Sequence, residues 1–304
     1  MQVRPFLQEG KRLFLLIAGY TTTHPLKLKA KQRGRIMTAL AEKAAENLVA
    51  LRKKKPLIHN ITNYVVMNYT ANALLAMGAS PVMAHAQNEV EDMVAFAGAL
   101  VLNIGTLTDD WIGSMIKAGK KASQLGTPII LDPVGSGATP LRTNSAKNII
   151  SETRIAVIRG NASEILSLRD ENSKTKGVDS IHSVDEATEA ARNLAGELHT
   201  TLTITGPVDL VTDGTRIIRI SNGHPLMGYV TGTGCTATAT IGAFLAVDKD
   251  PVSAAATALA FFGLAGEIAA ETASAPGTFM IQMLDALYTV TPRQLSERCK
   301  IEEE

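Results

Sequence analysis

Short apolar runs recur along this chain at regular intervals, and segments with a helical pattern lie between most of them. The runs are Leu57-Ile58, Pro81-Val82-Met83, Leu100-Val101-Leu102, Ile129-Ile130-Leu131, Ile155-Ala156-Val157-Ile158 and Leu202-Thr203-Ile204. The helical segments between them are Asn68–Met77, Glu89–Ala97, Asp109–Leu125 and Ser145–Glu152. Strands that alternate with helices at this spacing are typical of βαβ units. The sequence therefore predicts an α/β fold with a central, mostly parallel sheet flanked by helices.

Three further segments complete the predicted fold. An amphipathic helix is expected over Ala39–Lys54, before the first strand. Two runs joined by Asp213-Gly214, Asp209–Thr212 and Arg216–Ile220, predict a β-hairpin at the edge of the sheet. The stretch Thr233–Leu287 is expected to be almost entirely helical. No repeat or linker interrupts the pattern, so residues 37–304 are predicted to form a single domain.

The first 36 residues differ from the rest. They hold eight of the 30 Lys and Arg residues and one of the 29 acidic residues. The apolar run Leu13–Ala18 follows Lys11-Arg12, as in a signal peptide, but basic residues follow it where a small-residue cleavage site would be expected. Residues 1–36 are therefore predicted to be a basic extension, disordered or absent from the native protein, ahead of a start at Met37.

Composition limits the partners and the compartment. The chain beyond residue 36 carries 22 basic and 28 acidic residues, and a mildly acidic body without a basic patch argues against nucleic acid. Two cysteines give no disulfide framework and favour the cytoplasm. The apolar run Val252–Gly266 is too short for a bilayer and rich in Ala, so it predicts a buried helix and no membrane association.

Polar residues follow five of the predicted strands. They are His59-Asn60-Ile61-Thr62-Asn63, Asn103-Ile104-Gly105-Thr106, Asp132-Pro133-Val134-Gly135, Arg159-Gly160-Asn161-Ala162-Ser163-Glu164 and Thr205-Gly206. Each group alone is compatible with ordinary turns and caps. Asn161 or Ser163, for example, is a suitable N-cap, and Glu164 is favoured in a first helical turn. Ligands bind outside the carboxyl ends of parallel strands, so five polar groups at one edge predict a binding site there.

The residue types at this edge suit phosphoryl transfer. Asp132 and Glu164 offer the oxygen ligands that Mg²⁺ prefers, and the Arg159 guanidinium matches phosphate oxygens. The stretch VTGTGC, Val230–Cys235, precedes a predicted helix, where small residues leave backbone N–H groups open to an anion. The spacing of its glycines nominally fits a dinucleotide fingerprint, but the residues before it are predicted to form a loop rather than a strand. A Walker A motif is absent from the sequence, which excludes a P-loop kinase.

The chain from Pro56 to Tyr288 resembles hydroxyethylthiazole kinase, a member of the ribokinase-like superfamily. The resemblance lies in PLIHNITNYVVMNYTANALLAMGASPVMA (56–84), LVLNIGTL (100–107), ILDPVGSGAT (130–139), IRGNASEI (158–165) and VTGTGC (230–235). It implies a ribokinase-like fold and transfer of phosphate from ATP to the hydroxyl of 4-methyl-5-(2-hydroxyethyl)thiazole, towards thiamine. It also implies Mg²⁺ and a homotrimer with active sites between subunits. Residues 1–36 depart from the family pattern.

The resemblance assigns roles to particular residues. The thiazole ring would contact Asn63, Met83, Gly105 and Gly232, and Cys235 would meet the hydroxyl as the catalytic residue. ATP would contact Arg159 and Thr205, and the magnesium ion would lie near Asp132 and Glu164. The superfamily usually has an aspartate where Cys235 stands, and a neutral thiol is a poor proton acceptor. Cys235 is therefore expected to orient the hydroxyl or to shape the ring pocket.

Three alternatives compete with this interpretation. A kinase for another small alcohol, such as hydroxymethylpyrimidine, or a nucleotide-dependent repair dehydratase would use a similar anion-binding loop. A silent sensor of a nucleotide or of a thiamine-related ligand is disfavoured by the intact Asp132, Arg159 and Glu164. A cysteine hydrolase using Cys235 lacks a partner signature, because His224 lies before Pro225 in a predicted loop.

Overall fold

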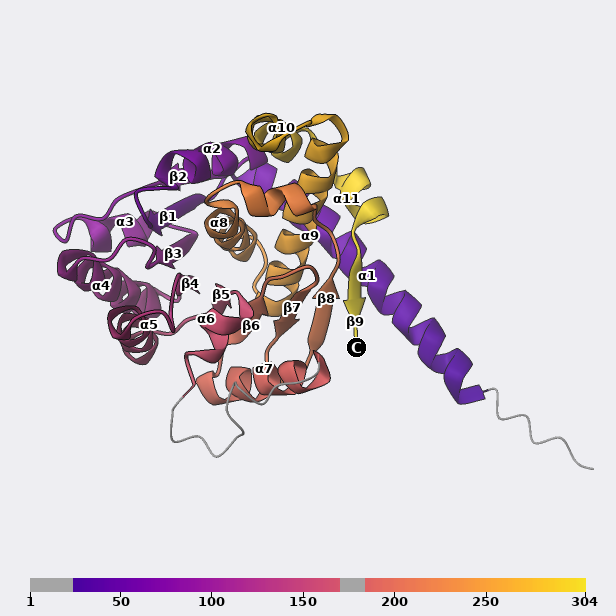
Figure 1. Cartoon of the computed structure of the whole chain (residues 1–304), viewed down its shortest axis with the longest axis horizontal. Helices are drawn as coiled ribbons and strands as arrows, with labels where there is room; N and C mark the ends of the chain where they lie inside the picture. The colour runs from indigo at the N-terminus through magenta and orange to yellow at the C-terminus, as the bar shows by residue number, and fades with distance from the viewer. Residues whose placement is uncertain (1–23, 170–183) are drawn as a thin grey trace, which may run out of the picture.

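A nine-stranded sheet runs through the centre of the protein, with helices on both faces (Figure 1). The computed structural model describes residues 24–169 and 184–304. The strands lie in the order β2-β1-β3-β4-β5-β6-β7-β8-β9; the first six are parallel and the last three pairings are antiparallel. Their bounds are β1 Leu57–Ile61, β2 Ser80–Val82, β3 Ala99–Asn103, β4 Ile129–Asp132, β5 Val157–Gly160, β6 Thr201–Ile204, β7 Asp209–Thr212, β8 Ile217–Ile220 and β9 Ile301–Glu303. The predicted mostly parallel α/β sheet is confirmed.

The sheet separates two hydrophobic cores, because successive side chains of a strand point to opposite faces. Val101 and Ile130 belong to one core, while Leu100 and Leu131 belong to the other. The helices over the first core are α1 His24–Lys54, α2 Met67–Met77, α8 Thr233–Leu245, α9 Pro251–Thr272, α10 Pro276–Thr289 and α11 Pro292–Arg298. Those over the second are α3 Val90–Phe96, α4 Asp109–Leu125, α5 Pro140–Glu152, α6 Ala162–Leu166 and α7 Val184–Leu198.

Local signals explain where the helices begin. Helix α4 has the predicted bounds, with the Thr108 side chain accepting a hydrogen bond from the backbone N–H of Trp111. Helix α5 begins at Pro140, five residues before the predicted start. The reason is a cap, because the Thr139 side chain accepts from the backbone N–H of Arg142 and Pro140 occupies the first helical position, where proline is favoured.

The predicted hairpin is present, but its predicted position at the sheet edge is wrong. Strands β7 and β8 pair antiparallel, as expected. Strand β9 then pairs with β8 and becomes the edge strand instead. Strand β9 follows the helical last third, outside the alternation of strands and helices, so no sequence pattern indicated it.

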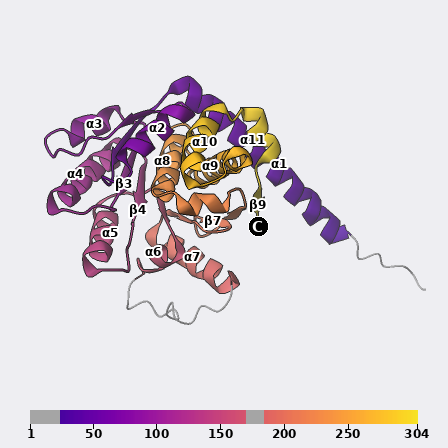
Figure 2. The same cartoon turned by 45° about the horizontal axis from the view of Figure 1, so that its top comes forward.

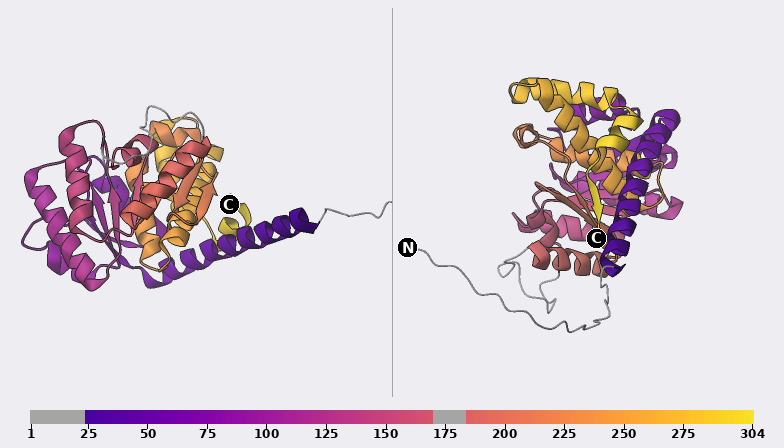
Figure 3. Two further views of the ribbon diagram at one scale, coloured as in Figure 1. Left: turned by 90° about the horizontal axis from the view of Figure 1, so that it is seen from below. Right: turned by 90° about the vertical axis from the view of Figure 1, so that its right-hand side faces the viewer.

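Helix α1 is longer than predicted. It begins at His24, whereas the amphipathic pattern indicated Ala39, and its first turns extend past the body of the protein (Figures 2 and 3). Among the α1 side chains whose burial the structure describes, those that enter the core include Ala44, Leu48 and Leu51, which lie after Met37. Residues 1–23 of the predicted basic extension lie outside the described residues.

Helix α9 is the core helix predicted from its apolar run. It spans 22 residues and is long and apolar enough to cross a membrane by length and composition alone, which corrects the expectation that the run is too short. However, 89% of its most apolar window is buried inside the protein. It packs against α8 and α10, which both lie over the same core.

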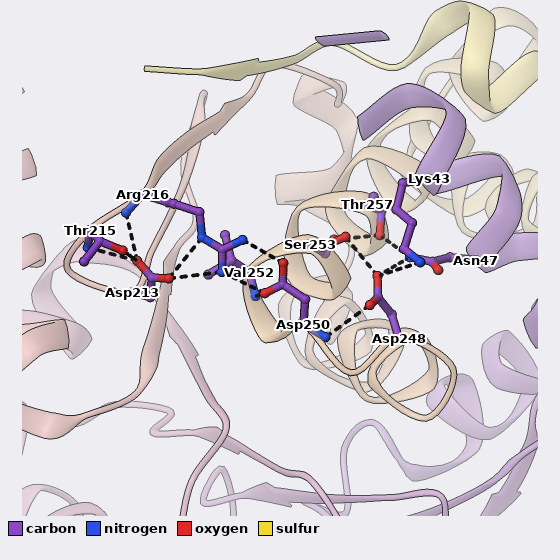
Figure 4. A network of polar contacts seen from close by, with 10 residues as sticks. All are labelled: Lys43, Asn47, Asp213, Thr215, Arg216, Asp248, Asp250, Val252, Ser253 and Thr257. Carbon is purple, nitrogen blue, oxygen red and sulfur yellow. Dashed lines mark hydrogen bonds and ion pairs between the residues drawn. The ribbon is translucent and has the colours of Figure 1, made fainter. Parts of the chain in front are cut away.

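A network of polar contacts follows the C-terminal end of α8, at Leu245 (Figure 4). The buried Asp248 Oδ2 accepts hydrogen bonds from Asn47 Nδ2 on α1 at 2.8 Å and from Ser253 Oγ on α9 at 2.9 Å. Arg216, directly before β8, donates two hydrogen bonds of 2.6 and 2.7 Å to the Asp250 carboxylate. We call this cluster the Asp248 network. It joins α1, the β7–β8 turn and the start of α9.

Candidate active site

A chain of hydrogen bonds links side chains at the carboxyl ends of β1, β3 and β4. Asn63 Nδ2, two residues after β1, lies 2.8 Å from Asn103 Oδ1 and 3.5 Å from Cys235 Sγ. Asn103 Nδ2 donates to Asp132 Oδ2 at 2.8 Å. Strands β3 and β4 pair in the register that places Asn103 opposite Asp132. Three of the predicted site residues, Asn63, Asp132 and Cys235, therefore lie together, and Asn103 connects them.

Two of the predicted glycines occupy positions that exclude a side chain. Gly105 donates its backbone N–H to Asn103 Oδ1, and a Cβ atom there would lie 2.6 Å from Asn63 Nδ2. Gly232 is the N-cap of α8 with φ +81°, a left-handed conformation that favours glycine. A Cβ atom at Gly232 would lie 2.5 Å from Val66 Cγ1. Both glycines thus allow close approach of the backbone around Asn63 and Cys235.

The guanidinium of Arg159 packs against the first turn of α8. A Cβ atom on Gly234 would lie 2.7 Å from Arg159 Nη1, so only glycine leaves room for this contact. Arg159 Nη2 donates to Thr205 Oγ1 at 2.6 Å, and the arginine side chain is 13% exposed. A helix N-terminus and a guanidinium both attract negative charge. Together they form a site suited to a phosphate group.

A cavity of about 580 Å³ opens beside this arginine. Polar lining comes from Arg159, Thr205 and Asp209, and backbone lining from Gly234. Large apolar side chains complete the wall: Met227, Leu259 and Phe262. Burial raises the pKa of Asp209 to about 6, against the hydrogen bond that its Oδ1 accepts from Gly206 N and the charge of Arg159. The cavity thus combines an anion-binding end with apolar surface.

The pKa values of Asp132 and Cys235 are both raised. Asp132 is completely buried, and desolvation raises its pKa to about 6, although Arg159 and a hydrogen bond from Thr238 oppose the shift. Desolvation, assisted by the charge of Asp132, also raises the pKa of the Cys235 thiol to about 11, while hydrogen bonds from Asn103 and Asn63 act against it. At neutral pH Cys235 is therefore a thiol rather than a thiolate, and it is a weak proton acceptor.

Glu164 acts as a cap. Its Oε2 accepts from the backbone N–H of Asn161 at 2.9 Å, and Asn161 Oδ1 accepts from Glu164 N, so the two residues form a capping box at the start of α6. Glu164 Oε1 accepts from Gly135 N at 2.8 Å, which ties this turn to the loop after β4. Its charge also raises the pKa of Asp132. Glu164 therefore has the capping role that was predicted from the sequence as the alternative to a metal-binding role.

The residues fit a magnesium ion that is shared with a nucleotide. Mg²⁺ in such sites is held by one or two carboxylates together with water and phosphate oxygens. Asp132 Oδ1 is buried and has no hydrogen-bond partner among the described residues. Glu164 supplies a second carboxylate, close enough for its charge to raise the pKa of Asp132. No group of three or more His, Cys, Asp or Glu side chains that could hold a metal occurs in residues 24–169 and 184–304.

Met83 lies next to the edge strand of the sheet, and among the described residues no hydrogen bond links its side chain to the other site residues. It follows the edge strand β2 and is half-buried. The backbone beside it is anchored, because the ring of the buried His59 makes a 2.7 Å hydrogen bond to the carbonyl of Ala84. Burial lowers the pKa of His59, which fits a neutral structural histidine. Contact of Met83 with a ring remains a prediction.

Sequence reasoning missed three residues that shape this site. Asn103 was noted only as part of a polar strand end, although the predicted parallel pairing of its strand with the one ending in Asp132 could have singled it out. Thr238 donates to Asp132 Oδ2 at 2.8 Å, one helical turn after Gly234. Arg142, on α5, donates to the carbonyls of Ile104, Gly105 and Val134, and so fixes two active-site loops. No pattern in the sequence indicates these contacts of Arg142.

Comparisons with known proteins give one consistent family. Residues 48–293 match the hydroxyethylthiazole kinase family. A protein named hydroxyethylthiazole kinase from Desulfotalea psychrophila is 66% identical over 267 residues, which cover 88% of this chain and 98% of that protein. One of the same name from Roseiflexus sp. is 48% identical over 88% of this chain and 99% of the relative. The solved hydroxyethylthiazole kinase protein from Pyrococcus horikoshii aligns with a TM-score of 0.79 at 46% identity, covering 86% of this chain and 98% of that one.

More distant structures share only the fold. A ribokinase-like superfamily protein from Enterococcus faecalis aligns with a TM-score of 0.56 at 15% identity, over 78% of this chain and 87% of that one. The pyridoxal kinase from Staphylococcus aureus in complex with AMP-PCP aligns with a TM-score of 0.53 at 17% identity, over 70% and 88%. The predicted ribokinase-like fold is confirmed.

Proposed function

The chain belongs to the hydroxyethylthiazole kinase family, and from that premise we propose that it transfers phosphate from ATP to the hydroxyl of 4-methyl-5-(2-hydroxyethyl)thiazole, in thiamine biosynthesis or salvage. The observation that carries the proposal is the position of Cys235. It lies in the first turn of α8, directly after Gly234, which the Arg159 guanidinium packs against, and its Sγ is 3.5 Å from the Asn63 amide nitrogen. An alcohol at the thiol would therefore face a phosphate bound by Arg159.

The acceptor alcohol is proposed to bind between Asn63, Gly105 and Gly232. Glycines at the last two positions let the backbone pack closely against the Asn63 and Val66 side chains, and Asn63 offers a polar group beside them. Met83, on the β2 side, would add an apolar contact to the thiazole ring. Since the Cys235 thiol is protonated at neutral pH, its role is to orient the hydroxyl by a hydrogen bond rather than to remove its proton.

The nucleotide is proposed to occupy the cavity next to Arg159 and Thr205. The guanidinium and the N-terminus of α8 would hold the transferring phosphate and stabilise charge on its oxygens. The apolar wall of Leu259 and Phe262 suits a nucleobase. In the transfer, the substrate oxygen forms a bond to the terminal phosphorus as the bond from that phosphorus to the ADP oxygen breaks, and the hydroxyl proton is released to solvent. Little covalent chemistry is required of the protein, so positioning and charge dominate catalysis.

Asp132 and Glu164 are proposed to hold Mg²⁺ together with the nucleotide. The ion would supply charge neutralisation between phosphate oxygens. Asp132 offers the buried, unpartnered Oδ1 described above. Glu164 keeps lone pairs beyond the two backbone hydrogen bonds that its oxygens accept.

A homotrimer with active sites between subunits is also proposed. Several large apolar side chains flank the site but remain exposed in the single chain: Tyr64 at 62%, Val65 at 69% and Tyr229 at 74%. Tyr64 and Val65 directly follow Asn63, and Tyr229 precedes the glycine loop. Burial of such a cluster against another copy would stabilise an assembly. Sedimentation velocity at several concentrations tests this, and a monomer at micromolar concentration would contradict it.

The cytoplasm is the proposed location. Both cysteines, Cys235 and Cys299, are free thiols, as expected in a reducing compartment.

A substrate screen tests the proposed activity. Purified protein is incubated with Mg-ATP and a set of small alcohols, ADP release is followed, and each product is identified by mass. We expect phosphorylation of hydroxyethylthiazole at far higher kcat/KM than of hydroxymethylpyrimidine. Equal or better turnover of the pyrimidine alcohol would refute the thiazole assignment. Ligand binding without any turnover would favour the sensor alternative.

A further inference from the structure

The Asp132 carboxylate is held through only one of its two oxygens. Oδ2 accepts hydrogen bonds from Asn103 Nδ2 and Thr238 Oγ1, both at 2.8 Å, and Arg159 Nη1 lies 3.9 Å from the same atom. Oδ1 has no partner in the described part of the chain. Asp132, Asn103 and Thr238 are all at most 1% exposed, so water does not compete for these contacts. The two donors therefore set the orientation of the carboxylate and leave Oδ1 available.

Asn103 also connects this carboxylate to the alcohol side of the site. Its Oδ1 accepts from Asn63 Nδ2 at 2.8 Å and from Gly105 N at 2.9 Å, while its Nδ2 donates to Asp132. An amide side chain has an acceptor oxygen and a donor nitrogen on one rigid plane. Neither a carboxylate nor an apolar side chain can make both sets of contacts. Movement of Asp132 is therefore coupled to movement of Asn63.

Thr238 connects the same carboxylate to the anion-binding turn. It lies on α8 one turn after Gly234, whose carbonyl is 3.3 Å from Thr238 Oγ1. Its hydroxyl thus joins β4 to the part of α8 that contacts Arg159. Thr240 offers a natural comparison, because it is equally buried on the same helix but, among the described residues, its hydroxyl bonds only to the backbone carbonyl of Thr236.

We propose that Asn103 and Thr238 are positioning residues for phosphoryl transfer: together they fix Asp132 relative to the acceptor alcohol and the bound phosphate. The inference rests on the proposed function. Reacting groups must be held within about 0.5 Å of the productive geometry, and a displacement of about 1 Å can cost about 100-fold in rate. Loss of either donor lets the carboxylate rotate, which affects the transition state more than the binding of substrates.

The test uses single substitutions in the full chain. Thr238→Val is nearly isosteric and removes only the donor; we expect kcat to fall about 10- to 100-fold, with KM for ATP and for the thiazole alcohol within about threefold of wild type. Thr238→Ser restores the hydroxyl and should recover kcat to within about threefold. Thr240→Val is the matched control and should retain the wild-type kcat. Calorimetric ADP binding should be unchanged in all three proteins, because Arg159 and Thr205 are untouched.

Asn103→Ala provides an independent measurement. It removes the link to Asn63 as well, so we expect a loss in kcat of about 100-fold and, unlike Thr238→Val, an increase of about fivefold or more in KM for the thiazole alcohol. ADP affinity should again stay at the wild-type value. This split between alcohol KM and nucleotide affinity would not follow from a general loss of structure.

Several results would overturn the inference. They are a wild-type kcat in Thr238→Val, an equal loss in Thr240→Val, a lack of recovery in Thr238→Ser, or an unchanged kcat and alcohol KM in Asn103→Ala. If Thr238→Val does not fold, Asn103→Ala decides the question. A wild-type protein that fails to phosphorylate the thiazole alcohol would remove the proposed function and this inference with it, whereas an active wild type with insensitive variants would remove only the inference.

Discussion

The two ends of α8 carry polar clusters of opposite character. At its N-terminal end Asp132 is completely buried, one of its oxygens is unpartnered among the described residues, and burial raises its pKa to about 6. In the Asp248 network at the other end, the Asp250 carboxylate is 40% exposed and both of its oxygens accept from Arg216. The hydrogen bonds from Arg216, against desolvation, lower the pKa of Asp250.

The difference lies in what each cluster leaves unsatisfied. In the Asp248 network the carboxylates of Asp248 and Asp250 accept hydrogen bonds from neighbouring side chains, which stabilises the junction of α1, the β7–β8 turn and α9. The cluster at Asp132 holds a charge in a poorly solvated place, which costs stability unless a ligand completes it. Each end also has one arginine, Arg159 or Arg216. Substitutions at the two ends should therefore separate loss of activity from loss of stability.

Arg159→Ala is expected to have the largest effect. It removes the guanidinium that packs on the first turn of α8 and contacts Thr205. Loss of transition-state charge stabilisation should lower kcat by about 10²- to 10³-fold. Steady-state kinetics measures kcat, and thermal melting measures stability. Activity within a few-fold of wild type would mean that the phosphate binds elsewhere.

Glu164→Gln comes next and separates its two roles. If Glu164 helps to hold Mg²⁺, kcat should fall about 100-fold and the Mg²⁺ concentration for half-maximal activity should rise. If it acts only as a cap, loss of one backbone hydrogen bond should cost about 1 kcal/mol of stability and leave kcat nearly unchanged. Thr291→Ala in the capping box of α11, which lies outside the active site, is the matched control.

Asp132→Asn should stabilise the protein while abolishing activity. The folded-state pKa of Asp132, about 6, is higher than the value near 3.9 of an unfolded chain, so its stabilising contribution is present at low pH and is lost as pH rises from about 4 through 6. Each pKa unit corresponds to about 1.4 kcal/mol, so we expect a gain of about 1–3 kcal/mol at pH 8 and almost none at pH 4. Urea unfolding at both pH values measures this. The same gain at pH 4 would show that ionisation is not the cause.

Arg216→Ala should lower stability and leave activity unchanged, the opposite of Asp132→Asn and a smaller effect. The arginine pairs with Asp250 and with Asp213, but its side chain is 39% exposed, so solvent screens the contacts. We expect a loss of about 1 kcal/mol in the free energy of unfolding and a wild-type kcat. Denaturant unfolding and the kinase assay measure the two quantities. A marked fall in kcat would show that the two ends of α8 are coupled.

Removal of residues 1–36 should have the smallest effect. The described α1 side chains that enter the core, among them Ala44, Leu48 and Leu51, lie after the new start. A chain that begins at Met37 should keep full activity, the same assembly size and a melting temperature within about 2 °C. Sedimentation and melting of the two chains side by side measure this. Dissociation of the shorter chain would show that the extension holds the subunits together.

The strength of each local signal explains how much of the fold was predictable. Apolar runs that alternate with helical patterns indicate strands β1 to β6 and helices α2 to α4, which lie at the predicted places to within a few residues. The start of α5 depends on the cap at Thr139, and the existence of β9 depends on pairing with β8. Strand β9 lies after the helical last third, outside that alternation, so its pairing with β8 defines it rather than its own sequence.

The sequence by itself determined the α/β architecture, the family, and the polar residues at the carboxyl ends of the strands, because periodicity and motif spacing are properties of the chain. Only the tertiary structure decided how those residues are connected. It placed Asn103 opposite Asp132 and brought Thr238 to the same oxygen from a position 106 residues later in the chain. It also placed a backbone N–H group within hydrogen-bonding distance of each Glu164 carboxylate oxygen. Hydrogen bonds need partners within about 3 Å, and contacts between residues far apart in sequence become definite only when the chain has packed.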